Sequence, residues 1–123
     1  NFLAHFENHT MDGVGVSPRV NAGLLPQFDG KRVCIVGRVL SQDADRVRVE
    51  CSDGGHTIVL SSDGQFNERS IIEVVGVAGD HANDGSMSLR SERICPLDDT
   101  FDLQNYEGLV NLVNGKARHL FMS

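Results

Sequence analysis

A cysteine and a histidine on either side of a turn are the residues whose spacing comes nearest to a catalytic pair. Cys51 and His56 flank Ser52-Asp53-Gly54-Gly55, a sequence typical of a tight hairpin. A thiol becomes an effective nucleophile when a base lies within hydrogen-bonding reach. Pairs of this kind along a sequence are more often incidental than catalytic. We therefore expect no enzymatic activity.

Two acidic clusters contain the residue types of a cation site. One comprises Asp80, His81 and Asp84, and the other comprises Asp98, Asp99 and Asp102. Acidic side chains at such positions usually form turns or interact with the positive end of a helix dipole. We therefore expect these residues to shape the backbone, and we expect no metal and no cofactor.

The cysteines also disfavour a metal site. Cys34, Cys51 and Cys95 are odd in number and contain no C-x-x-C pair, so neither a disulfide framework nor a structural zinc site is expected. Isolated cysteines in apolar segments usually behave as small buried hydrophobes, which fits a reducing compartment. No segment approaches the roughly 20 apolar residues that cross a bilayer, so we expect no membrane association.

The 123 residues carry a formal net charge of -6, which argues against a protein that binds nucleic acid mainly through its own charge. The predicted strands contain no aromatic residue on which a base could stack. Arginines on these strands could still form a weak phosphate-binding track, although pairing with Glu50, Glu92 and Asp43 is the simpler interpretation. The candidate nucleic-acid contacts are Arg38, Arg46, Arg48 and Arg90.

Five β-branched segments form the predicted sheet. They span 32–40, 46–51, 56–60, 71–77 and 87–94, and Gly37 and Gly76 lie in the middle of two of them. Glycines inside strands indicate the bulges and sharp bends by which a small barrel closes. An all-β, five-stranded barrel of the oligonucleotide/oligosaccharide-binding (OB) type is therefore expected, with a short helical plug before the first strand and Pro96 ending the sheet.

Three regions follow from this pattern. Residues 1–18 form a leader, whose first ten residues we interpret as vector-derived or upstream sequence before Met11. Residues 19–97 form the barrel. Residues 98–123 form a C-terminal helix, for which Thr100 is the expected N-cap.

The C-terminal segment carries a heptad seam. Its apolar residues recur at spacings of 3 and 4, which is typical of a helix that pairs with other helices. Packing on the chain's own barrel is the alternative, but such a helix rarely keeps heptad spacing. On the opposite face, Leu112 between Gly108 and Gly115 would also permit close helix approach. The predicted partner-binding residues are Leu103, Tyr106, Leu109, Val110, Val113, Ala117 and Leu120.

Several segments resemble one known family. Residues 19–28 (RVNAGLLPQF), 33–39 (VCIVGRV), 72–76 (IEVVG) and the Phe101-Asp102-Leu103 start of the helix are similar to the smallest subunit of replication protein A. The resemblance spans residues 19–120. It implies an OB barrel whose C-terminal helix joins a three-helix bundle with the middle and large subunits of a nuclear heterotrimer.

The resemblance also implies a function. Such a heterotrimer binds single-stranded DNA during replication, repair and recombination, and its smallest subunit is mainly structural. Because the barrel lacks stacking residues, we expect the isolated chain to bind single-stranded DNA only weakly. Two alternatives remain open: an autonomous OB module that binds single-stranded nucleic acid, and the small OB subunit of a telomere-capping complex.

Overall fold

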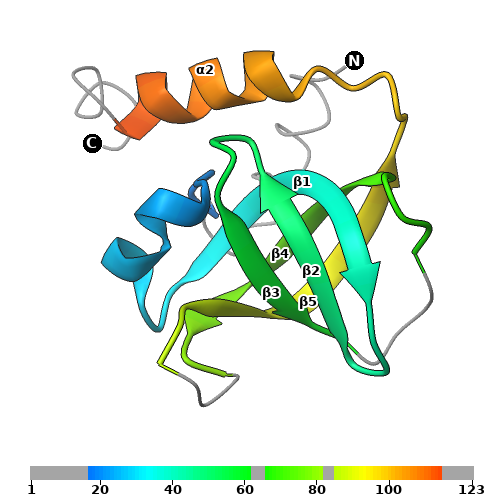
Figure 1. Ribbon diagram of the computed structural model, residues 1–123. Helices are drawn as coiled ribbons and strands as arrows, with labels where there is room; N and C mark the ends of the chain where they lie inside the picture. The colour runs from blue at the N-terminus through cyan, green and yellow to red at the C-terminus, as the bar shows by residue number, and fades with distance from the viewer. Residues whose placement is uncertain (1–16, 62–65, 82–84, 115–123) are drawn as a thin grey trace.

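The strands close into a barrel in the computed structural model, which describes residues 17–61, 66–81 and 85–114. The strand order around the barrel is β1-β2-β3-β5-β4, as expected for an OB barrel (Figure 1). The predicted all-β barrel with a C-terminal helix is confirmed. The strands are β1 (Arg32–Gln42), β2 (Arg46–Cys51), β3 (His56–Leu60), β4 (Ile71–Gly79) and β5 (Ser88–Leu97).

All strand pairs are antiparallel except β3 and β5, which run parallel and close the barrel. Three strands are longer than predicted, since β1 and β4 each run two residues further and β5 ends at Leu97. Pro96 therefore does not end the sheet. It lies in β5 opposite Ile72, near the end of the β4 ladder.

The mid-strand glycines lie where neighbouring strands come closest. A β-carbon on Gly37 would lie 2.6 Å from the carbonyl oxygen of Glu50 on β2. A β-carbon on Gly76 would overlap the carbonyl oxygen of Arg90, next to the register shift between Val75 and Gly76. These positions allow the strands to bend together, as the sequence predicted.

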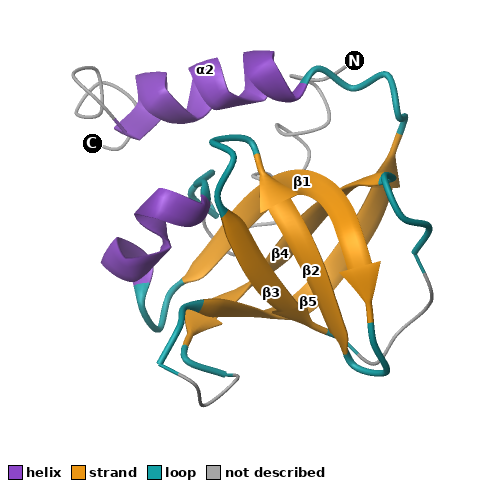
Figure 2. Cartoon of the chain, in the orientation of Figure 1, coloured by secondary structure: helices purple, strands orange, loops and turns teal. Residues whose placement is uncertain are grey.

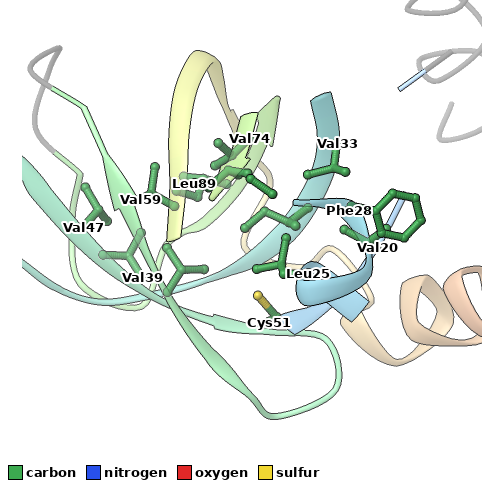
Figure 3. Close-up of a cluster of buried hydrophobic side chains, with 14 residues drawn as sticks. Val20, Leu25, Phe28, Val33, Val39, Val47, Cys51, Val59, Val74 and Leu89 are labelled. Carbon is green, nitrogen blue, oxygen red and sulfur yellow. The ribbon is translucent and has the colours of Figure 1, made fainter. Parts of the chain in front are cut away.

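The barrel interior is filled by aliphatic side chains from every strand, including Val39, Val47, Val59, Val74 and Leu89 (Figure 3). Each of these side chains is buried because inward and outward residues alternate along the strands. One end of this core is closed by the short helix η1 (Ala22–Phe28).

Helix η1 contributes Leu25 and Phe28 to the core, so the predicted plug is confirmed. Its N-cap is Asn21, whose side chain accepts a hydrogen bond from the Leu24 amide at 3.1 Å. Pro26 lies inside this helix. A 3₁₀ turn tolerates proline there because the proline ring fixes φ near the helical value.

Helix α2 (Leu103–Asn114) lies alongside β1 at one end of the barrel (Figures 1 and 2). Its N-cap is Asp102 and not Thr100, because the Asp102 carboxylate accepts the Asn105 amide at 3.0 Å. Thr100 instead donates its amide and hydroxyl to the Asp98 carboxylate, which caps the preceding turn. No helix among the described residues has the length and apolar character needed to span a membrane.

Candidate assembly helix and nucleic-acid face

The centre of the predicted helix seam faces the chain's own barrel. Tyr106 and Val110 are completely buried, and they pack with Cys34, Val36 and Ile71 in a second apolar cluster outside the barrel interior. This corrects the assignment of Tyr106 and Val110 as partner-binding residues, since their contacts lie within the chain. The inference that a helix on its own barrel rarely keeps heptad spacing is wrong over this segment.

Tyr106 is the largest side chain in this second cluster. Its hydroxyl donates a hydrogen bond to the carbonyl oxygen of Cys34 at 3.3 Å. Burial, the largest cause, raises the pKa of the Tyr106 phenol well above its ordinary value, and burial likewise raises the pKa of the Cys34 thiol. Both groups therefore stay neutral at physiological pH.

Glu107 links α2 by hydrogen bonds to the start of η1 and to the turn after β2. Its carboxylate accepts hydrogen bonds from the Asn21 side-chain amide at 3.1 Å and from the Ser52 hydroxyl at 2.7 Å. Asn114 adds a link by donating to the carbonyl oxygen of Arg19 at 2.9 Å. These polar contacts were not identified from the sequence, because no local pattern pairs Glu107 with residues 86 and 55 positions earlier.

The remaining seam residues are less buried. Leu103 and Leu109 are half-buried and pack against the second cluster, and Val113 is half-buried as well. Ala117 and Leu120 lie outside the described residues.

The side of α2 that points away from the barrel carries an exposed leucine. Leu112 is 51% exposed, and it is the large hydrophobic residue with the greatest exposure in the described part of the chain. Gly108 lies one turn before it, and a β-carbon there would meet no atom within 4 Å. Together with exposed Asn105, these residues form what we call the outer face of α2.

Three of the four candidate arginines gather on one outer surface of the barrel. Arg46 lies opposite Leu60 on β3, and Leu60 lies opposite Arg90 on β5, so the arginines flank the leucine in one row. Arg48 follows two residues after Arg46 on the same side of β2. Arg38 lies on the neighbouring strand opposite Glu50, and its guanidinium donates to the carbonyl oxygen of Arg69 at 2.8 Å.

The possible catalytic pair is not formed. Cys51 points into the barrel core, whereas His56 is exposed on the outer surface and lies 3.8 Å from the Glu50 carboxylate. Burial is also the main reason that the pKa of the Cys51 thiol is raised to about 12, which keeps it protonated. A nucleophilic thiolate therefore does not arise here.

The acidic clusters have structural roles in the described residues. Asp98 accepts the amide and hydroxyl of Thr100, which lowers the pKa of its carboxyl, and Asp102 caps α2. Asp80 accepts the Gly85 amide at 3.3 Å, and the His81 ring contacts the Val77 carbonyl oxygen at 2.8 Å. Asp84 lies outside the described residues.

Comparison with known proteins identifies the family. Residues 11–120 match the model of the family described as Replication factor A protein 3. The chain belongs to this family. Two Replication protein A 14 kDa subunits of Arabidopsis thaliana are also similar to it, at 31% and 32% identity. Each match covers 91% of this chain and all of the relative.

Family membership decides two of the questions raised by the sequence. The Replication factor A protein 3 family consists of non-enzymatic subunits, so the expectation that the chain is not an enzyme is confirmed. The resemblance to the smallest replication protein A subunit is likewise confirmed, and the family match includes all the segments on which it was based.

Solved structures show the same fold. A chain in the structure of U. maydis Replication protein A bound to ssDNA aligns with a TM-score of 0.72 at 22% identity, covering 87% of this chain and 96% of that chain. The telomere capping protein Ten1 of Schizosaccharomyces pombe aligns with a TM-score of 0.62 at 14% identity, covering 80% and 97%. The fold is therefore common to both kinds of protein, and the sequence match distinguishes them.

Proposed function

We propose that this member of the Replication factor A protein 3 family is the structural subunit of a nuclear heterotrimer that binds single-stranded DNA. Its partners would be the middle and large subunits of replication protein A, joined to it through a three-helix bundle. The proposal is supported by the relatives named as 14 kDa subunits of Replication protein A. Through this assembly the chain would serve replication, repair and recombination.

The outer face of α2 carries this proposal. The inner face is already occupied by the barrel, so a partner helix must approach from the side of Gly108 and Leu112. The small residue before the leucine permits the close approach of two helix backbones, and the exposed leucine supplies apolar area to bury.

Docking on the barrel prepares the helix for assembly. A helix of 12 residues that contains glycine and several asparagines would be marginal alone in water. The contacts of Tyr106, Val110 and Glu107 hold it in place before a partner arrives. Association then costs less conformational entropy than the folding of a free segment would.

Co-expression with the two larger subunits tests this function. We expect native mass spectrometry to find one copy of this chain with one copy of each partner. The rival function, an autonomous nucleic-acid-binding module, would leave the chain as a monomer in the presence of both subunits. A monomer under these conditions would therefore refute the proposal.

A further inference from the structure

The exposed side of α2 carries no charged residue in the part of the helix that the structure describes. Its exposed residues are Gln104, Asn105, Gly108, Asn111 and Leu112. More than half of the exposed residues elsewhere in the described chain are Asp, Glu, Lys or Arg. A helix whose outer side stays in water normally carries charged residues there, whereas the centres of protein interfaces are depleted of them. The exposed side of α2 therefore has the composition of a contact surface.

Two rows of residues run along this exposed side. Asn105, Gly108 and Leu112 form the outer face of α2 defined above. Gln104, Gly108 and Asn111, spaced by four and three residues, form a second row that we call the amide row. Adjacent residues of an α-helix point about 100° apart, so Gln104 and Asn105 face different directions. A helix packed over one of these residues leaves the other largely exposed.

The side chain of Asn111 is oriented through the barrel. Its amide nitrogen Nδ2 donates a hydrogen bond to Oε2 of Glu107 at 3.2 Å. The same carboxylate accepts hydrogen bonds from the Asn21 amide and the Ser52 hydroxyl, which hold it in place. An ionised carboxylate only accepts hydrogen bonds, so Asn111 must present its nitrogen to Glu107 and turn its carbonyl oxygen Oδ1 away. Asn111 therefore offers an acceptor in a fixed direction.

The amide row can form hydrogen bonds beyond those within the chain. Among the described residues, neither Oδ1 of Asn111 nor the side-chain amide of Gln104 has a hydrogen-bond partner. Both side chains are exposed, so water satisfies these groups. A macromolecule that displaces this water must replace its hydrogen bonds, because a buried polar group without a partner is costly. A ligand of the amide row must therefore place a hydrogen-bond donor opposite Asn111.

Gly108 leaves open space between the two amides of the row. A β-carbon at this position would meet no atom within 4 Å. Such a gap accepts the protruding side chain of a neighbouring helix. The amide row has no cation to bind phosphate and no large apolar side chain to enter a membrane surface. A helix with one large side chain and a nearby donor is the ligand that fits.

We propose that the amide row binds a second helix of the heterotrimer, distinct from the helix on the outer face of α2. This second helix places a large apolar side chain over Gly108 and a hydrogen-bond donor opposite Asn111. The inference rests on the proposed assembly function, in which each larger subunit supplies one helix. The barrel then covers the inner face of α2, and the two partner helices pass on either side of Gly108.

Photo-crosslinking in the assembled complex tests the two contacts. A benzophenone amino acid is introduced at position 104 or at position 105 of the full chain, which is co-expressed with both larger subunits. We expect position 104 to crosslink to one larger subunit and position 105 to the other. Crosslinks from both positions to the same subunit would overturn the proposal, as would a crosslink from position 104 to a second copy of this chain or to no subunit. Failure of the wild-type chain to assemble would instead refute the proposed function.

Two substitutions test the chemistry of the amide row. Each variant is co-expressed with differently tagged wild-type chain and both larger subunits, and the ratio of the two chains in the purified complex is measured. Gly108→Leu fills the gap, and we expect its incorporation to fall at least tenfold. Leucine is a better helix former than glycine, so the melting temperature of the isolated variant should not fall. Asn111→Ala removes the acceptor, and its incorporation should fall roughly fivefold.

Asn67→Ala is the matched control for Asn111→Ala. Asn67 is exposed between β3 and β4, and the hydrogen bonds from Ser70 reach its backbone carbonyl oxygen, which alanine keeps. We expect this control to be incorporated as wild type is. Equal incorporation of Asn111→Ala and wild type, or equal losses for Asn111→Ala and Asn67→Ala, would overturn the proposal. Amide spectra of the isolated Asn111→Ala chain should retain the signals of docked α2, which separates a lost contact from a lost helix.

Discussion

The hydroxyl of Tyr106 donates a hydrogen bond to the carbonyl oxygen of Cys34, which precedes it by 72 residues. This contact joins the C-terminal helix to the first strand of the barrel. Tyr106 and Val110 fill the space between the two elements and are inaccessible to solvent. The helix is therefore part of the folded domain through one face, whereas the other face, with Leu112, is exposed.

Truncation of Tyr106 should destabilise the chain strongly. Tyr106→Ala removes a buried aromatic ring, and we expect a loss of about 3–5 kcal/mol in the free energy of unfolding. Tyr106→Phe keeps the ring and loses a single hydrogen bond, so the loss should be about 1 kcal/mol. Urea denaturation followed by circular dichroism measures both values. A loss below about 1 kcal/mol for Tyr106→Ala would show that the helix does not dock on the barrel.

Two glycine-to-alanine substitutions should have opposite effects on stability. Gly76→Ala places a methyl group against the backbone of β5, which cannot move aside without breaking the ladder, and should cost about 1–3 kcal/mol. Gly108→Ala adds a methyl group in open space within a helix and should stabilise the chain by about 1 kcal/mol.

Thermal unfolding of the two variants checks this pair. We expect the melting temperature to fall for Gly76→Ala and to rise for Gly108→Ala. Because Gly108 lies on the outer face of α2, its alanine variant should also bind the partner subunits less tightly than wild type. Destabilisation by Gly108→Ala would contradict the solvent-facing position of this residue.

The three thiols should differ in reactivity under native conditions. Cys34 and Cys51 are buried with raised pKa values, about 12 for Cys51, whereas Cys95 is half-buried with its backbone in β5. At about pH 8 a disulfide reagent should modify Cys95 first, and the other two only on unfolding. Mass spectrometry of digested protein identifies the modified residue, and rapid native modification of Cys51 would contradict its burial.

The same thiols make stability depend on alkaline pH. A group with a raised pKa in the folded state stabilises that state below its ordinary pKa, here 9.0, and this contribution is lost as pH rises through the folded value. We therefore expect the free energy of unfolding to decrease from about pH 9 upward. Cys51→Ala should reduce this dependence.

The sequence was sufficient to predict the barrel because its signals are local. Alternation along β2 and β3, and glycines such as Gly37 and Gly76, specify strands and the bends that close them. The family resemblance, based on the segments around η1, β1 and β4, was also correct. Helix termini were less well predicted, since capping by Asp102 in place of Thr100 depends on the path of the turn before α2.

The sequence could not predict that α2 packs on its own barrel. A heptad seam indicates which residues are buried, but it does not indicate which element covers them. A strand surface carrying Cys34 and Val36 satisfies the seam as well as another helix would. The small residue Gly108 one turn before Leu112 indicates a second contact face on α2, but two residues are a weaker pattern than the seven of the heptad seam. The contacts of Glu107 and the clustering of Arg46, Arg48 and Arg90 depend on tertiary pairing, for which one sequence gives no direct signal.

The most direct test of the account is the effect of a charge on the outer face of α2. Leu112→Glu places a carboxylate at a half-exposed position, so the stability of the isolated chain should change by less than about 0.5 kcal/mol. Gln27→Glu is the matched control, because it adds the same charge at an exposed position of η1 and not on α2.

The measurement is co-purification with the tagged middle and large subunits after co-expression. The account predicts that the amount of Leu112→Glu recovered with the complex is at least tenfold lower than that of wild type, whereas Gln27→Glu is retained. Retention of folded Leu112→Glu at the wild-type level would contradict assembly through the outer face of α2.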